Sequence, residues 1–230
     1  MKKLVFLTGA GISAESGITT FRDSGGLWEQ YPVEAVASIQ GYYRDPALVI
    51  QFYNERRRQL KSVEPNKAHQ LVAALEKNYD VCVVTQNVDN LHERAGSTRV
   101  IHLHGELSKV CSMNNRTTCV KEYPLTTPIK VGDKAEDGAQ LRPYIVMFGE
   151  YIDGMDTAIH FVKNADVFVV IGTSLKVYPA AGFIRYAHKE VPKFVIDPGE
   201  MEQCVELGFT HIKTTATEGM RMLLETFKEL

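Results

Sequence analysis

Residues 4 to 14 read L-V-F-L-T-G-A-G-I-S-A, a short apolar run that passes into a glycine turn at 9–11. This order is typical of a buried strand that ends in a tight turn before a helix. The glycines match the loose G-x-G-x-x-G/A pattern, in which backbone approaches a pyrophosphate at a helix N-terminus. By itself the match is weak, because a turn without any ligand has the same form.

Similar apolar runs recur along the chain, and helical periodicity separates most of them. The expected strands are 4–7, 81–85, 100–103, 144–148, 167–171 and 194–196, and the expected helices are 66–77, 155–164, 180–189 and 217–230. Nearly continuous apolar runs are buried on both faces of a sheet, and their alternation with helices predicts an α/β fold. We therefore expect a Rossmann-like, doubly wound parallel sheet.

Two stretches interrupt this alternation, at about 21–65 and about 106–141, and both are richer in glycine, charged or polar residues. We expect them to form a small inserted domain or lid. The predicted large part comprises about 1–30, 66–105 and 142–230, and the predicted small part about 31–65 and 106–141. A chain of 230 residues is long enough for one substantial core with such an insertion.

Composition excludes several other classes of protein. A formal net charge of -2 without a long Lys/Arg run argues against a nucleic-acid partner. The apolar run after the basic start is too short for a signal peptide, and no stretch approaches the ~20 apolar residues of a membrane span. The four cysteines are scattered, which does not favour a disulfide framework. We expect a cytoplasmic monomer without a membrane partner.

Polar side chains follow the run 81–85, where the chain reads T-Q-N-V-D-N-L-H at 85–92. Ligands of such sheets bind outside the carboxyl ends of the strands. Gln86, Asn87 and Asp89 place amides and one carboxylate there, a set that suits a ribose or an amide ligand. His92 lies one turn into the next helix, and we interpret it as a packing or capping histidine.

Two more histidines occur in V-I-H-L-H-G at 100–105. With a period of two, His102 and His104 share one face, and both could be core residues. His104 directly precedes Gly105 and so should emerge at the same rim as Asn87, where a neutral imidazole can accept a proton from a hydroxyl. No serine elbow or Cys-His pair is evident, so we expect the substrate to supply the nucleophile.

The segment 21–31, F-R-D-S-G-G-L-W-E-Q-Y, stands where a dehydrogenase would have a second strand ending in an acidic residue. Its composition indicates a loop. With Phe21, Arg22 and Trp28 it could fold over a bound dinucleotide, or it could be an ordinary surface connection.

Six ordered motifs cover nearly the whole chain: G-A-G-I-S at 9–13, G-I-T-T-F-R at 17–22, T-Q-N-V-D at 85–89, H-G at 104–105, F-G-E at 148–150 and G-T-S-L-K-V-Y-P at 172–179. Together they resemble the sirtuin family of NAD-dependent protein deacylases. The resemblance implies that NAD⁺ is consumed as a co-substrate, that the acyl oxygen of an acyl-lysine displaces nicotinamide, and that lysine and an O-acyl-ADP-ribose are released.

The resemblance also implies roles for individual residues. His104 would be the base that deprotonates a ribose hydroxyl, with Asn87 also in the catalytic set. Two segments would clamp the peptide as an added strand: Phe148, Gly149 and Glu150, and Leu175, Lys176 and Val177. The cofactor-binding residues would be Gly9, Ala10, Gly11, Ile12, Ser13, Phe21, Arg22, Trp28, Gln86, Asn87, Val88, Asp89, Gly172, Thr173, Ser174 and Asp197, the last where the family often has Asn.

Acyl preference is suggested by Tyr53 and Arg56, which lie three apart and so on one helix face. They match the Tyr-x-x-Arg pair by which one sirtuin class, including many bacterial members, binds the carboxylate of succinyl- or malonyl-lysine, through an arginine fork and a tyrosine hydroxyl. We expect desuccinylase and demalonylase activity, accompanied by deacetylation. We interpret Arg57 and Arg58 as a solvated basic face.

One departure from the family concerns zinc, which sirtuins usually hold with two C-x-x-C pairs. Here Asn114 takes the partner position of Cys111, Cys119 stands alone, and 131–140 contains no cysteine. We predict no zinc and no other metal.

Two other kinds of protein remain possible at this point. An NAD-dependent ADP-ribosyltransferase or NAD hydrolase would use the same pocket without needing Tyr53 and Arg56. A non-catalytic dinucleotide sensor would keep the glycine turn but have little use for His104.

Overall fold

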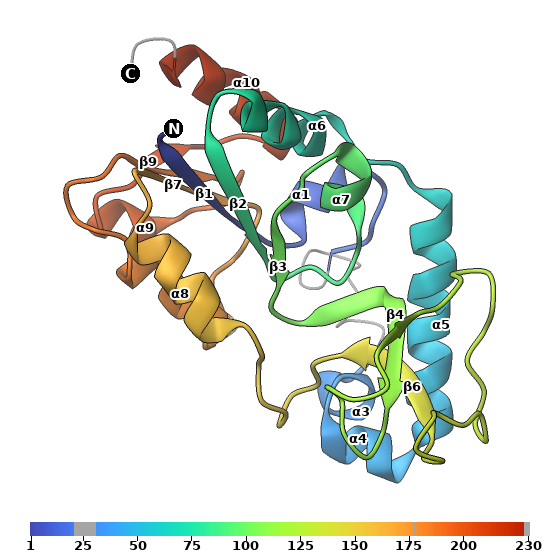
Figure 1. Ribbon diagram of the computed structural model, residues 1–230. Helices are drawn as coiled ribbons and strands as arrows, with labels where there is room; N and C mark the ends of the chain where they lie inside the picture. Colours follow the sequence, from blue (N-terminus) through green and yellow to red (C-terminus); the bar gives the residue numbers. More distant parts are fainter. Residues whose placement is uncertain (21–30, 177, 228–230) are drawn as a thin grey trace.

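The main sheet has six parallel strands in the order β3-β2-β1-β7-β8-β9 (Figure 1). The computed structural model describes residues 1–20, 31–176 and 178–227, so Phe21, Arg22, Trp28 and Val177 lie outside the described residues. The strands are β1 (Lys3–Thr8), β2 (Asp80–Thr85), β3 (Val100–His102), β7 (Val167–Ile171), β8 (Lys193–Ile196) and β9 (Thr210–Ile212). This sheet confirms the predicted α/β fold.

Both faces of the sheet are covered because the strands are apolar on both sides. Leu4 and Phe6 of β1 pack with α6 (Lys67–Ala74) and α10 (Ala216–Phe227), whereas Val5 and Leu7 pack with α8 (Met155–Lys163) and α9 (Glu202–Glu206). The 3-10 helix η2 (Ala180–Arg185) completes the second layer. The prediction of a helix over 180–189 was therefore wrong in type and too long.

A second, antiparallel sheet lies at one end of the main sheet, in the order β5-β4-β6 (Figure 1). It consists of β4 (Gly105–Ser112), β5 (Lys121–Glu122) and β6 (Leu141–Ile145). The strand predicted at 144–148 belongs here, where Gly105 pairs with Ile145, and not in the parallel sheet. An apolar run shows that a strand is buried but not which strand it pairs with, and the sixth parallel strand, β9, was missed because it is short. The division into a large and a small domain stays a prediction.

The remaining helices surround these sheets: α1 (Gly11–Ala14), α3 (Val33–Val36), α4 (Ile39–Arg44), α5 (Pro46–Ser62), the 3-10 helix η1 (Leu75–Lys77) and α7 (Leu91–Ala95). Helix α5 begins with an Asp45 side chain that accepts a bond from Leu48 N, 2.9 Å away, and with proline in the first turn, a favourable start. Among the described residues, no helix combines the length and apolarity needed to cross a bilayer.

Arg57 of α5 is 1% exposed and binds carbonyls of β4 and of the loop that follows β5, so its predicted place on a solvated face was wrong. Its guanidinium donates to the carbonyl of Leu107 and, through Nη2, to those of Pro124 (2.7 Å), Tyr123 (3.3 Å) and Thr127 (3.4 Å). A periodic pattern cannot show that a charged residue has buried carbonyls to bind. Arg58, by contrast, is exposed as predicted.

Asn54, one turn before Arg57, extends this attachment. Its amide nitrogen donates to Ile129 O at 2.8 Å, and its oxygen accepts from Ile129 N at 3.0 Å, as a paired strand would. The absence of zinc stays a prediction. What α5 contributes is a set of bonds to five backbone carbonyls in segment 106–141 that need no metal.

We predict that Arg57→Met lowers the free energy of unfolding by about 3 kcal/mol, because it leaves several buried carbonyls without donors. For a chain of this size that corresponds to a fall in Tm of about 6–12 °C. Thermal unfolding of Arg58→Met, which removes the same charge from an exposed position, is the control and should shift by less than about 0.5 kcal/mol. Equal shifts in the two variants would contradict the role of Arg57.

Candidate functional site

The carboxyl ends of five parallel strands form one row. Thr8 is in register with Thr85 on one side and Ile171 on the other, Thr85 pairs with His102, and Ile171 pairs with Ile196. Residues immediately after four of these ends, together with His104, open into one cleft of about 830 Å³. The cleft lies at the place where the strand order reverses, between β1 and β7, which is where ligands bind in such sheets.

Two glycine turns meet at this reversal. A Cβ on Gly9 would lie 2.6 Å from the Cβ of Thr173, and a Cβ on Gly11 would lie 2.6 Å from the Cα of Gly172. Gly172 itself has a positive φ of 61°. The glycines are therefore required by the contact between the two turns, in addition to any approach of a ligand.

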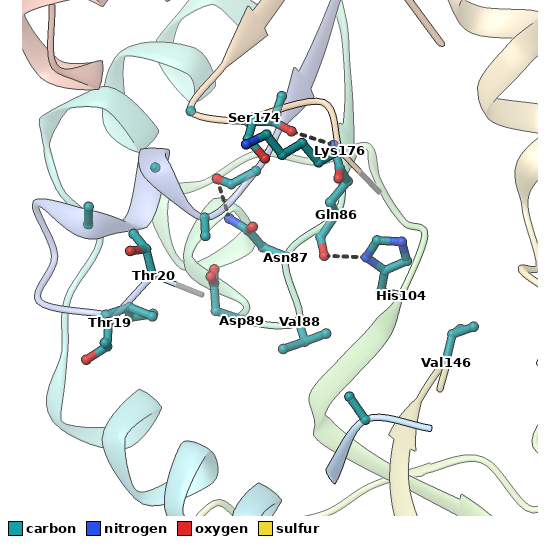
Figure 2. Close-up of a pocket in the computed structure, with 18 of the residues that line it drawn as sticks. Thr19, Thr20, Gln86, Asn87, Val88, Asp89, His104, Val146, Ser174 and Lys176 are labelled. Atoms are coloured by element: carbon teal, nitrogen blue, oxygen red, sulfur yellow. Dashed lines mark hydrogen bonds between the residues drawn. The ribbon is translucent and has the colours of Figure 1, made fainter. Parts of the chain in front are cut away.

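Asn87 and Asp89 lie on the floor of the cleft (Figure 2). The Asn87 amide nitrogen donates to Gly9 O at 3.0 Å, which orients the side chain; none of the described residues donates to its oxygen. Asp89 accepts from Ser13 Oγ at 3.0 Å and from Leu91 N at 3.1 Å. Burial raises the pKa of Asp89, and these two bonds oppose the shift. A carboxylate held this way is preoriented toward a positive charge in the cleft.

His104 lies between β3 and β4, just past the strand in which it was predicted. Its Nδ1 is 2.9 Å from the carbonyl oxygen of Gln86 (Figure 2). A carbonyl only accepts, so Nδ1 carries the proton and Nε2 keeps its lone pair. Burial lowers the pKa of His104, and the bond to Gln86 only partly offsets this. The side chain is thus a neutral base at neutral pH.

His102 has a different state, although it lies only two residues away. Its Nδ1 bonds to Asn87 O at 3.1 Å and its Nε2 to Glu93 at 2.7 Å. Burial would lower the pKa of His102, but the hydrogen bond and charge of Glu93 raise it above its ordinary value. A charged imidazole satisfied on both sides is structural.

Glu93, His102 and Glu106 are the one group in the described part of the chain whose His, Cys, Asp or Glu ligand atoms lie within 4.8 Å of one another. Glu93 already binds His102, and Glu106 lies 2.6 Å from Lys109, so these side chains are satisfied without an ion.

His92 is buried in α7 and packs as predicted. Its Nε2 lies 3.1 Å from Thr8 Oγ1, which donates to Thr85 Oγ1 at 2.9 Å. This bond ties the helix to the ends of β1 and β2.

Tyr53 and Arg56 line the opposite side of the cleft, and both come from α5. Arg56 has two buried nitrogens, Nε and Nη1, without hydrogen-bond partners among the described residues, and its Nη2 lies 3.6 Å from Glu55. The guanidinium also stacks 4.9 Å from the centre of the Phe52 ring. Burial lowers the pKa of Arg56 and raises the pKa of Tyr53. Partly desolvated donors of this kind are suited to an anion.

The segment after β6 forms another wall. Phe148 is 46% exposed and lines the cleft, and Gly149 follows with a positive φ of 95°. Glu150 also borders the cleft, but its carboxylate accepts from Arg142 at 2.5 Å and from Met147 N at 2.8 Å. Glu150 therefore holds this turn in shape.

Most of the predicted site residues meet in the cleft: Gly9, Ala10, Gly11, Tyr53, Arg56, Gln86, Asn87, Val88, Asp89, His104, Phe148, Gly149, Glu150, Gly172, Thr173, Ser174 and Asp197. Ile12 and Ser13 lie beneath it, Ile12 in the core and Ser13 against Asp89. Sequence reasoning missed Val146 as a lining residue, since nothing in its local pattern distinguishes it, and it placed Lys176 only in a peptide-clamping segment (Figure 2).

Comparison with known proteins agrees with this geometry. The Sir2 family model matches residues 9–179. An NAD-dependent protein deacylase of Bacteroides thetaiotaomicron is 55% identical over 226 residues, covering 97% of each chain. One from Helicobacter pylori is 48% identical over 230 residues, covering 100% of this chain and 99% of the relative.

Solved structures agree as well. A Sir2 homologue in complex with NAD has a TM-score of 0.86 and 40% identity, with coverage of 99% of this chain and 90% of the other. A Sir2 complex with an inhibitor, 2'-O-acetyl-ADP-ribose and a deacetylated peptide has a TM-score of 0.78 and 31% identity, with coverage of 98% and 94%. The chain therefore belongs to the Sir2 family and is an NAD-dependent deacylase.

Proposed function

We propose that this deacylase acts on acyl-lysine side chains of proteins and prefers succinyl and malonyl groups, whose carboxylate Arg56 and Tyr53 bind. The observation that carries the preference is the pair of buried Arg56 nitrogens without partners in the described structure. Unpaired buried donors are costly, and an anionic ligand would remove that cost. An acetyl group has no carboxylate and would leave them unpaired.

The cleft fits NAD by the chemistry of its lining. Its volume of about 830 Å³ lies within the range of ligand pockets, and the oxygen of Asn87 and the lone pair of His104 remain open. When bound, NAD supplies an electrophilic ribose carbon with nicotinamide as the leaving group. Asn87 and Asp89 would orient the nicotinamide ribose and stabilise positive charge that develops there.

His104 would accept a proton from a ribose hydroxyl at Nε2. The carbonyl of Gln86 holds Nδ1–H, which fixes both the tautomer and the direction of the ring. Phe148 and Gly149 border the cleft where an extended peptide would pass.

The proposal is tested by mass spectrometry of matched succinyl- and acetyl-lysine peptides incubated with the protein, with and without NAD⁺. We expect NAD⁺-dependent loss of succinyl that outpaces loss of acetyl. Consumption of NAD⁺ with both peptides left intact would favour an NAD hydrolase, and transfer of ADP-ribose to a protein would favour an ADP-ribosyltransferase.

We predict that His104→Ala lowers kcat for deacylation by about 10²- to 10⁴-fold, the usual contribution of a general base. Because the pKa of His104 is lowered, it stays neutral down to a pH below the ordinary 6.5. The acid limb of kcat/KM in the unaltered enzyme should therefore lie below 6.5, with constant activity above it. His160→Ala is the control, because His160 is an exposed residue of α8 that does not line the cleft. An unchanged rate in His104→Ala would rule out His104 as the base.

We predict that Arg56→Met lowers kcat/KM for a succinyl-lysine peptide by about 10- to 100-fold, as expected for loss of charge-assisted hydrogen bonds. Tyr53→Phe should cost about 10-fold, since only its hydroxyl is lost. Activity on the matched acetyl peptide should change by less than about twofold in both, with Arg58→Met as the charge-matched control. A parallel loss on both peptides would show that these residues support the fold instead of selecting the acyl group.

A further inference from the structure

We propose that Lys176 binds the diphosphate of NAD and supplies a positive charge that the described cofactor side of the cleft otherwise lacks. The inference rests on the proposed function for the identity of the ligand. It concerns a residue whose segment the family resemblance assigns to peptide binding and whose side chain has no assigned ligand.

The backbone of the turn after β7 directs Lys176 into the cleft. Leu175 has a positive φ of 52°, a left-handed conformation that a residue with a bulky side chain seldom adopts. Its side chain is nevertheless 6% exposed and packed in the core, and its N–H donates to Thr173 Oγ1 at 3.3 Å. With Leu175 anchored inward, the next residue is exposed and lines the cleft.

The ammonium group of Lys176 is available for a ligand. In Figure 2 its side chain lies beside Ser174, with the ammonium end directed away from His104 and toward the Asn87 side of the cleft. None of the ion pairs among the described residues involves Lys176.

Lys176 is one of only two lysine or arginine side chains among the described residues that line the cleft. Among the described lining residues the carboxylates are Glu15, Asp89, Glu150, Asp197 and Glu200, and the lysines and arginines are Arg56 and Lys176. Arg56 stands beside Phe52 on α5, the acyl side. A diphosphate with two negative charges would thus meet a largely acidic lining. Of the two described cations, Lys176 is the one that follows a glycine turn directly, four residues after Gly172.

Four of the five amides at 9–13 in the first glycine turn already donate within the protein. Gly9 N already donates to Ile171 O at 3.0 Å and Gly11 N to Gly172 O at 2.8 Å. Ile12 N and Ser13 N are likewise bonded to carbonyls within the turn, at 3.2 and 3.0 Å. Because these four amides are occupied, the cradle of free N–H groups around a phosphate is reduced here, and a side-chain cation can add to it.

The test is calorimetric titration of ADP-ribose into the full chain and its Lys176→Met variant, without acyl peptide. We expect Kd for ADP-ribose to rise about 5- to 10-fold, as for one partly exposed charge contact, and the salt dependence of binding to become shallower. Lys176→Arg should restore most of the affinity. Adenosine, which lacks phosphate, should bind both proteins equally.

Lys130→Met is the matched control, because Lys130 is exposed, lies outside the cleft and carries the same charge. An unchanged Kd for ADP-ribose in Lys176→Met would overturn the proposal, as would a rise in KM confined to acidic acyl-peptides, which would place Lys176 on the substrate side. If the unaltered chain failed to bind ADP-ribose, the NAD assignment itself would fall. Normal binding by the unaltered chain and the variant alike would refute only the role of Lys176.

Discussion

Contact between the glycine turns at 9–11 and at 172 is the constraint on which the rest of the site depends. A Cβ at Gly172 would lie 2.4 Å from Ile12 N and one at Gly11 would lie 2.6 Å from the Gly172 Cα, so neither glycine can be replaced by a residue with a side chain. This contact joins the two turns at the point where the strand order of the sheet reverses. The same bonds occupy the amides of Gly9 and Gly11, which leaves fewer free N–H groups for a bound anion.

Burial and hydrogen bonding give neighbouring side chains of the same type different protonation states and different partners. His102 faces Glu93 and carries charge, whereas His104 faces only the Gln86 carbonyl and stays neutral. Asp89 accepts hydrogen bonds from Ser13 Oγ and Leu91 N, whereas Glu150 forms an ion pair with Arg142. The partners of each side chain therefore decide which histidine stays neutral and which carboxylate is engaged by an arginine.

Helix α5 contributes residues both to the cleft and to the attachment of the loop after β5. Tyr53 and Arg56 face the cleft, and Asn54 and Arg57, each one position further along, bind backbone carbonyls and an amide of segment 106–141. Successive residues of a helix point about 100° apart, which lets one helix place one pair of residues at the cleft and another pair against the loop. Disturbing Asn54 or Arg57 should therefore also disturb the wall of the cleft that Tyr53 and Arg56 form.

The sequence by itself determined the parallel sheet and most of the cleft lining. Its apolar runs mark the strands, and in a parallel sheet the residues that follow strand ends, such as Asn87 and His104, must share one edge. Only the tertiary structure decided that 141–145 joins the second sheet, that Arg57 is buried, that Glu150 is held by Arg142 and that Lys176 turns into the cleft. The physical reason is that periodicity states which face of an element a residue occupies, whereas its partner on that face comes from a segment distant in the chain.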